Sequence, residues 1–183
     1  MSGPRSPGYK GQKLSAKFKR YWIPNSIAFL TVVTAHRKPL FKDHSAVIMA
    51  KDVLRRVKEI HPFEMKGYTI LPDHMHLMIH TSDGRFDHVI QSFKRNLSIE
   101  FHRCGIVLDR DIWLKRFYDH VIRDDDDFKN HLDYIHFNPV HHGITLRPMD
   151  HPFSSFRHYV KIGWYDVGWG DMVPRNIDGM KLD

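Results

Sequence analysis

The sequence has few of the features that mark secreted, membrane-spanning or disulfide-bonded proteins. Its 183 residues include one cysteine, Cys104, so no disulfide can form within the chain and no thiolate cluster can bind a metal. The longest strongly apolar run, residues 27–33, is too short to span a bilayer. The basic N-terminus lacks the apolar segment of a secretory signal. We therefore expect a soluble, cytoplasmic protein, because a reducing compartment suits a lone thiol.

Acidic residues are absent before Asp43. Nine Lys and Arg precede it, whereas the other 141 residues carry 19 basic and 21 acidic side chains. The formal net charge of +7 therefore comes entirely from the N-terminal part of the chain. A basic arm favours a polyanionic partner such as nucleic acid, because each neutralised phosphate releases counterions. A solubilising tail would have the same composition, and charge alone does not separate the two.

The order of the predicted elements indicates a single α+β domain. Strand composition is found at residues 27–34, 68–71, 74–80 and 117–122, and helix spacing at residues 43–60, 86–101 and 124–137. Asp43 is predicted to cap the first helix, and Pro139 to end the third. The order β-α-β-β-α-β-α predicts a ferredoxin-like sandwich, in which an antiparallel sheet carries helices on one face.

Two histidines in the predicted strand at 74–80 form a candidate metal site. Side chains alternate along a strand, so His74 and His76 point to one face and Met75 to the other. Two imidazoles on one face can bind a divalent cation. A pair of surface histidines explains the same spacing, because a chance His-x-His is not rare in a chain with 15 histidines.

The predicted third helix adds a candidate nucleophile. Tyr134 and Asn138 lie four residues apart and share a face with His131. Each residue alone is an ordinary one for its place, a half-buried aromatic and a polar residue before proline. Combined with the histidines, the Asn138 amide would give three metal ligands and leave positions for phosphate oxygens and water. Tyr134 could then attack phosphorus and form a phosphotyrosine, which conserves the bond energy needed for rejoining.

Several segments resemble a known family. LPDHMHLMIH at 71–80 resembles the His-hydrophobe-His motif of the HUH single-strand nucleases, and YIHFNPVHHGI at 134–144 resembles the tyrosine helix of single-tyrosine transposases. With the segments at 61–76, 113–124 and 151–160, the chain is most similar to REP-associated tyrosine transposases over residues 21–170. We therefore expect a flexible basic arm (1–20), a transposase domain (21–170) and a C-terminal tail (171–183).

The resemblance implies a role for each matched residue. Tyr134 would be the nucleophile, and the ligands of Mg²⁺ or Mn²⁺ would be His74, His76 and Asn138. The products would be a 5′-phosphotyrosine and a free 3′-hydroxyl, made from palindromic repeats that fold into hairpins beside a short guide sequence. Members of the wider family act as monomers or as homodimers, and both states stay open. His141 replaces the lysine usual in this motif, which puts a phosphate contact there in doubt.

Basic and aromatic residues outside these motifs are candidates for DNA contact, because single strands bind through phosphate contacts and base stacking. The candidates are Arg20, Tyr21, Trp22, Lys94, Arg95, Lys115 and Arg116. A solvated helix face explains Lys94 and Arg95 equally, and Trp113 is predicted to anchor the core. The acidic run at 124–127 is expected to cap its helix. His141, His142 and His151 are expected to be loop histidines without a catalytic role.

Three functions compete on this evidence. The first is a metal-dependent, sequence-specific endonuclease and strand transferase acting on repeat hairpins in single-stranded DNA. The second is a catalytically silent protein that binds such hairpins, against which the intact set of candidate residues argues. The third is an RNA-binding module on a similar sandwich, which would place stacking aromatics rather than His-Met-His on the central strand.

Overall fold

The alternation of apolar residues along the central strands determines how the layers of the fold are arranged. The computed structural model describes residues 22–180, so Arg20 and Tyr21 lie outside the described residues. The elements are β1 (Ser26–Val33), α1 (His44–Ile60), β2 (Glu64–Ile70), β3 (His74–Thr81), α2 (Phe86–Arg103), β4 (Tyr118–Val121), α3 (Asp125–His141) and α4 (Phe156–Lys161). The sheet has the order β2-β3-β1-β4 with antiparallel neighbours, which confirms the predicted α+β sandwich.

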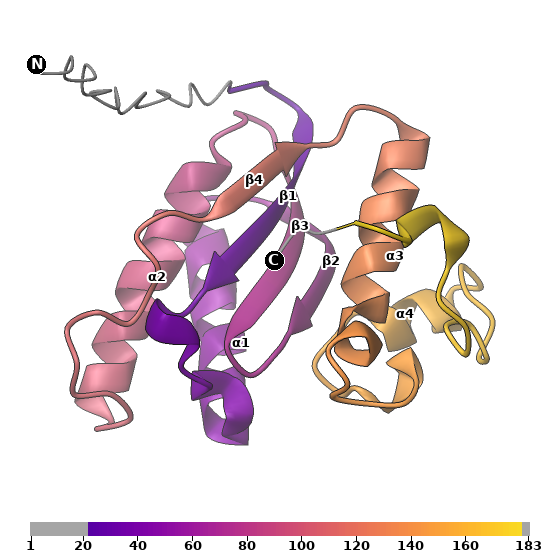
Figure 1. Ribbon diagram of the computed structural model, residues 1–183. Coiled ribbons are helices and arrows are strands. Elements are labelled where there is room, and N and C mark those ends of the chain that lie inside the picture. The colour runs from indigo at the N-terminus through magenta and orange to yellow at the C-terminus, as the bar shows by residue number, and fades with distance from the viewer. Residues whose placement is uncertain (1–21, 181–183) are drawn as a thin grey trace, which may run out of the picture.

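Helices cover both faces of this sheet (Figure 1). Helices α1 and α2 pack on the face that carries Leu30 of β1 and Leu77 of β3, as expected. Helix α3 packs on the opposite face, against Phe29 and Met78, so the expectation of helices on one face holds only for α1 and α2. The reason is that both faces of the central strands carry large apolar side chains, and each face must be buried.

Gly67 allows α3 to approach the sheet closely. A Cβ atom at this position in β2 would lie 2.7 Å from the Leu132 Cδ1 atom of α3. That separation is well inside van der Waals contact, so a side chain at Gly67 would force the helix or Leu132 to move. The lack of a side chain at Gly67 therefore helps to position the helix that carries Tyr134.

The predicted helix caps are present, but Pro139 does not end α3. The Asp43 side chain accepts a hydrogen bond from the Ser45 amide at 2.9 Å, and Asp124 accepts one from the Asp127 amide at 2.8 Å. Helix α3 continues through Pro139 to His141. Proline removes a single amide donor near the end of the helix, and the buried side chains up to Pro139 keep this last turn packed.

Two further expectations concern Trp113 and the membrane. The Trp113 indole donates a hydrogen bond to Ser98 Oγ at 2.9 Å and its ring packs near Phe93 of the core, as predicted for an anchor. In the part of the chain that the structure describes, no helix is both long and apolar enough to cross a membrane.

Candidate active site

His74 and His76 of β3 are buried side by side on the face that α3 covers. Their side chains lie on the same face of the strand with ring centroids 5.0 Å apart, and the residues are 1% and 0% exposed. The His74 Nδ1 atom lies 2.6 Å from an Asp73 carboxylate oxygen, and the His76 Nδ1 atom lies 3.0 Å from Thr31 Oγ1. Because these contacts engage Nδ1 of each ring, Nε2 is the nitrogen that each histidine would present to a metal.

Asp73 holds the His74 ring as an ionised carboxylate. Burial raises the pKa of the Asp73 carboxyl, but hydrogen bonds and charges from His74 and Arg37 outweigh it, so the pKa lies below its usual value. An ionised carboxylate can only accept, so His74 must donate from Nδ1. This arrangement orients the imidazole and increases the basicity of Nε2, as outer partners of metal-binding histidines do.

A stripe of residues on α3 lies against the histidine pair. Tyr134 and Asn138 are four residues apart and so occupy one side of the helix, and His142, the residue that follows the helix, continues this side. The Tyr134 ring lies 5.4 Å from the His76 ring, and the His142 ring lies 5.0 Å from the His74 ring. Asn138 lies between these two contacts and therefore faces the same pair. The structure thus brings together the four predicted site residues, and places beside them His142, which lies in a turn as expected. His141 was also expected in a loop, but it is the last residue of α3.

The Asn138 side chain tests whether a metal fits this place. Asn138 is 1% exposed, and neither atom of its amide has a hydrogen-bond partner among the described residues. An unsatisfied buried amide destabilises a fold by about 1–3 kcal/mol, so such groups normally have a ligand. An oxygen ligand beside two imidazoles is a donor set that suits Mn²⁺ and is compatible with Mg²⁺. The residues present therefore fit a divalent cation.

A second group of potential ligands lies one helical turn away. His120, Asp127 and His131 have ligand atoms within 4.8 Å of one another. The centroids of the two imidazole rings lie 4.5 Å apart and the rings are nearly parallel, at 11°, so their in-plane lone pairs do not converge on one point. Asp127 accepts hydrogen bonds from His120 Nε2 at 2.8 Å and from the Arg123 amide at 3.0 Å. We interpret this group as a hydrogen-bonded cluster that joins α3 to β4.

A chain of hydrogen bonds lies behind Tyr134 on the other side of α3. The Tyr165 hydroxyl donates to Asp133 Oδ1 at 2.6 Å, so its oxygen accepts from His136 Nδ1 at 3.2 Å. His136 Nε2 then accepts from Ser155 Oγ, 2.7 Å away. Burial lowers the pKa of His136 to about 3, which keeps the ring neutral. No sequence signal could have found these contacts, because the partners lie far apart in the chain.

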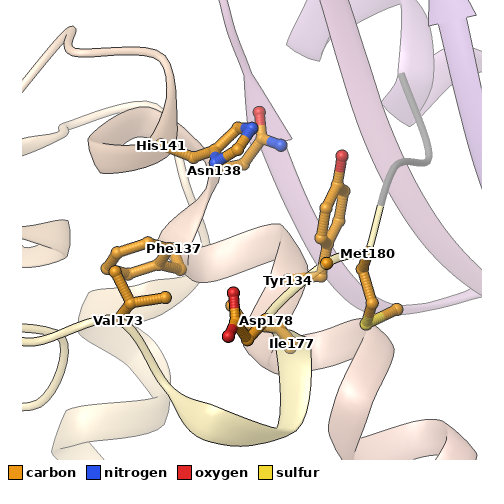
Figure 2. Close-up of a pocket in the computed structure, with 9 residues that line it drawn as sticks. Tyr134, Phe137, Asn138, His141, Val173, Ile177, Asp178 and Met180 are labelled. Atoms are coloured by element: carbon orange, nitrogen blue, oxygen red, sulfur yellow. The ribbon is translucent and has the colours of Figure 1, made fainter.

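A cavity of about 340 Å³ lies beside Tyr134. Figure 2 shows the side chains around it, with Asn138 and Tyr134 from α3 and Asp178 and Ile177 from the C-terminal segment, residues 173–180. This segment was expected to be a tail outside the domain. Its residues up to Met180 instead pack against α3, and Ile177 is buried in the same apolar cluster as Tyr134.

The candidate DNA-binding residues are spread over the molecule. Lys115 and Arg116 are exposed, and they follow Leu114, whose amide donates to the carbonyl oxygen of Val33 opposite His74. They therefore lie near the histidine end of the sheet.

Lys94 differs from the other candidates because its ammonium donates to the Leu114 carbonyl at 2.7 Å. It therefore supports the loop before β4. Arg95 is exposed. The Trp22 ring is partly exposed, and the Arg85 guanidinium lies 4.6 Å from its centroid.

Comparison with known proteins identifies the class to which this fold and site belong. The family model described as "Transposase IS200 like" matches residues 25–138. The REP-associated tyrosine transposase of Escherichia coli (strain K12) is 34% identical over 160 residues, which cover 86% of this chain and 93% of that protein. A solved structure of a REP-associated tyrosine transposase bound to a REP hairpin has a TM-score of 0.77 and 32% identity, and the match covers 87% of this chain and 93% of that chain.

The chain therefore belongs to the IS200-like transposase family, whose tyrosine transposases cut and rejoin DNA. Enzymes of this family are generally metal-dependent.

Proposed function

We propose that this protein is a metal-dependent endonuclease and strand transferase that acts on palindromic repeat hairpins in single-stranded DNA, with Tyr134 as the nucleophile. The observation that carries the proposal is the position of the Tyr134 ring against His76, one helical turn from the buried Asn138 amide. The substrate class is supported by the solved relative, which was bound to a REP hairpin.

The reaction requires a phenol oxygen next to the scissile phosphate. Tyr134 Oη attacks the phosphorus, the bond to the 3′-oxygen breaks, and the products are a 5′-phosphotyrosine and a free 3′-hydroxyl. The phenol must lose its proton, because a tyrosine has an ordinary pKa of about 10. Attack by the 3′-hydroxyl of another strand on the phosphotyrosine reverses the step and releases Tyr134. This exchange would join DNA without an external energy source.

His74, His76 and Asn138 are the residues that we propose to hold Mg²⁺ or Mn²⁺. When bound, the cation would neutralise charge on the non-bridging phosphate oxygens and favour the phenolate. Asp73 fixes the orientation of the His74 ring, and Thr31 lies against Nδ1 of His76. The protein's own contribution is thus to present both Nε2 atoms and the Asn138 amide from rigid, buried elements.

The basic candidates supply the contacts that keep DNA beside the site. We propose that Lys115 and Arg116 bind phosphates next to the histidine end of the sheet, and that Arg95 extends this surface along α2. Trp22 could stack on a base because its ring is partly exposed. Arg20 and Tyr21 precede it in the sequence and are assigned to the same role, although they lie outside the described residues.

A cleavage assay tests the proposal. Wild type, Tyr134→Phe and Tyr68→Phe are incubated with labelled hairpin DNA from the repeats that flank the gene, with Mn²⁺ or with a chelator, and run on a denaturing gel. Tyr68 is the matched control, because its side chain packs with the core on the opposite face of the sheet. We expect a metal-dependent covalent band with wild type and Tyr68→Phe, and none with Tyr134→Phe.

Two other results would favour different functions. Tight hairpin binding without a covalent band at any metal concentration would refute the enzyme and leave the silent DNA-binding protein. Tighter binding to ribose hairpins than to deoxyribose hairpins would favour the RNA-binding module.

A further inference from the structure

The C-terminal segment is fixed to the helix that carries Tyr134. Asp133 is 2% exposed, and both of its carboxylate oxygens accept hydrogen bonds from residues beyond α4. The Tyr165 hydroxyl lies 2.6 Å from Oδ1, and the Asn176 amide nitrogen lies 2.8 Å from Oδ2. A buried carboxylate without partners is strongly unfavourable, so the position of this segment is coupled to the fold of α3. Residues 173–180 therefore form a wall of the cavity beside Tyr134 that is held in place by these hydrogen bonds.

The side chains that line this cavity define what it can bind. The apolar part of the lining is Phe137, Val173, Ile177 and Met180, and Asp178 supplies a carboxylate. Tyr134, Asn138 and His141 line the side of the cavity next to the proposed active site. The volume of about 340 Å³ is at the small end of ligand pockets, which span roughly 300–1,000 Å³. A small, flat, apolar group with hydrogen-bond donors fits such walls.

The charge of Asp178 decides which part of a nucleotide enters. A carboxylate repels a phosphate group, so the phosphate must lie elsewhere. Figure 2 shows the Tyr134 hydroxyl pointing away from Asp178. If the scissile phosphate lies at that hydroxyl, the base of the adjacent nucleotide can occupy the cavity, because only one sugar separates this base from the phosphate. Bases stack on aromatic and apolar side chains, and an aspartate accepts a hydrogen bond from an exocyclic amino group.

We propose that this cavity binds the nucleobase next to the scissile phosphate and that Asp178 selects a base with an exocyclic amino group. The proposal rests on the function proposed above and adds a base-reading role for the C-terminal segment. Adenine, cytosine and guanine carry an amino group, whereas thymine does not. The sharpest comparison is cytosine against thymine, because the two pyrimidines are close in size and differ at the amino position.

The test combines base changes with two side-chain changes. Hairpin DNA with a single-stranded flank carries cytosine or thymine at each flanking position in turn, and both binding and covalent-complex formation are measured. Binding is measured in Tyr134→Phe, so this part does not depend on cleavage. At one position we expect the protein to prefer cytosine by roughly tenfold, and we expect Asp178→Asn to abolish this preference, because an amide can also donate to the thymine oxygen.

The second change fills the cavity. Val173→Trp adds bulk from an exposed wall position, and Val167→Trp is the matched control, because Val167 is also exposed and does not line the cavity. We expect Val173→Trp to lower covalent-complex formation at least tenfold and Val167→Trp to leave it unchanged. Hairpin affinity through the basic surface should be retained in both.

The outcomes separate this inference from the proposed function. An unchanged cytosine preference in Asp178→Asn at every position, or an unchanged or faster reaction of Val173→Trp, would overturn the base-binding role while leaving the transposase intact. Faster cleavage would mean that the segment covers the site rather than contacting DNA. Asp178-dependent discrimination in the binding measurement, without any covalent complex from wild type, would support the base pocket and refute the nuclease.

Discussion

Replacement of His136 by glutamine should change how the stability of the protein depends on pH. Burial lowers the pKa of this imidazole to about 3, whereas a histidine in an unfolded chain has a pKa near 6.5. The folded state therefore keeps His136 neutral in a pH range where the unfolded state binds a proton. Stability from this group is complete above the unfolded pKa and is lost as the pH falls from about 6.5 toward 3.

The size of the effect follows from these two pKa values. One proton of difference changes the free energy of unfolding by about 1.4 kcal/mol per pH unit. Between pH 7 and pH 5 the unfolded state becomes protonated at this site and the folded state does not, so wild type should lose about 2 kcal/mol from His136 alone. His131 and His151 have pKa values that burial also lowers, so they add to the slope in wild type and in the variant alike.

Urea unfolding at pH 7, 6 and 5 measures this quantity. His136→Gln should be less stable than wild type at pH 7, because it disrupts the bond to Ser155, but its loss between pH 7 and pH 5 should be smaller by about 2 kcal/mol. His102→Gln, which removes an exposed histidine, controls for the loss of any histidine. An unchanged pH slope in His136→Gln would refute the reasoning, because it would mean that the buried ring is protonated in the folded protein.

Other changes test the packing of α3 and the orientation of the site. Gly67→Val should lower the melting temperature and destabilise the fold by about 1–3 kcal/mol, since it overpacks the contact with Leu132; unchanged melting would show that α3 can shift at no cost. Asp73→Asn should weaken Mn²⁺ binding about 10- to 100-fold in calorimetry, because it loosens the His74 ring, and equal affinity would exclude this orienting role. Asp127→Ala should destabilise the protein by about 1–3 kcal/mol, because it removes the carboxylate that accepts hydrogen bonds from both His120 and the Arg123 amide. Chemical denaturation would detect this loss.

Much of the site follows from local rules that act over a few residues. The two-residue period of a strand places His74 and His76 on one face of β3. The four-residue spacing on a helix places Tyr134 and Asn138 on one side of α3. The caps at Asp43 and Asp124 also follow from side chains that bond to nearby amides. These features depend on short-range geometry, so the sequence by itself was enough to predict them.

The remaining features needed the tertiary structure. Packing of α3 on the second face of the sheet depends on the missing side chain of Gly67 and on the apolar residues of β1 and β3. His142 joins the site because α3 continues through Pro139, where local preference predicts an end. The bonds from Tyr165 and Asn176 to Asp133 span more than 30 residues. Burial of residues 131–139 of α3 outweighs local preference here, and only the folded chain determines which distant groups satisfy its buried polar atoms.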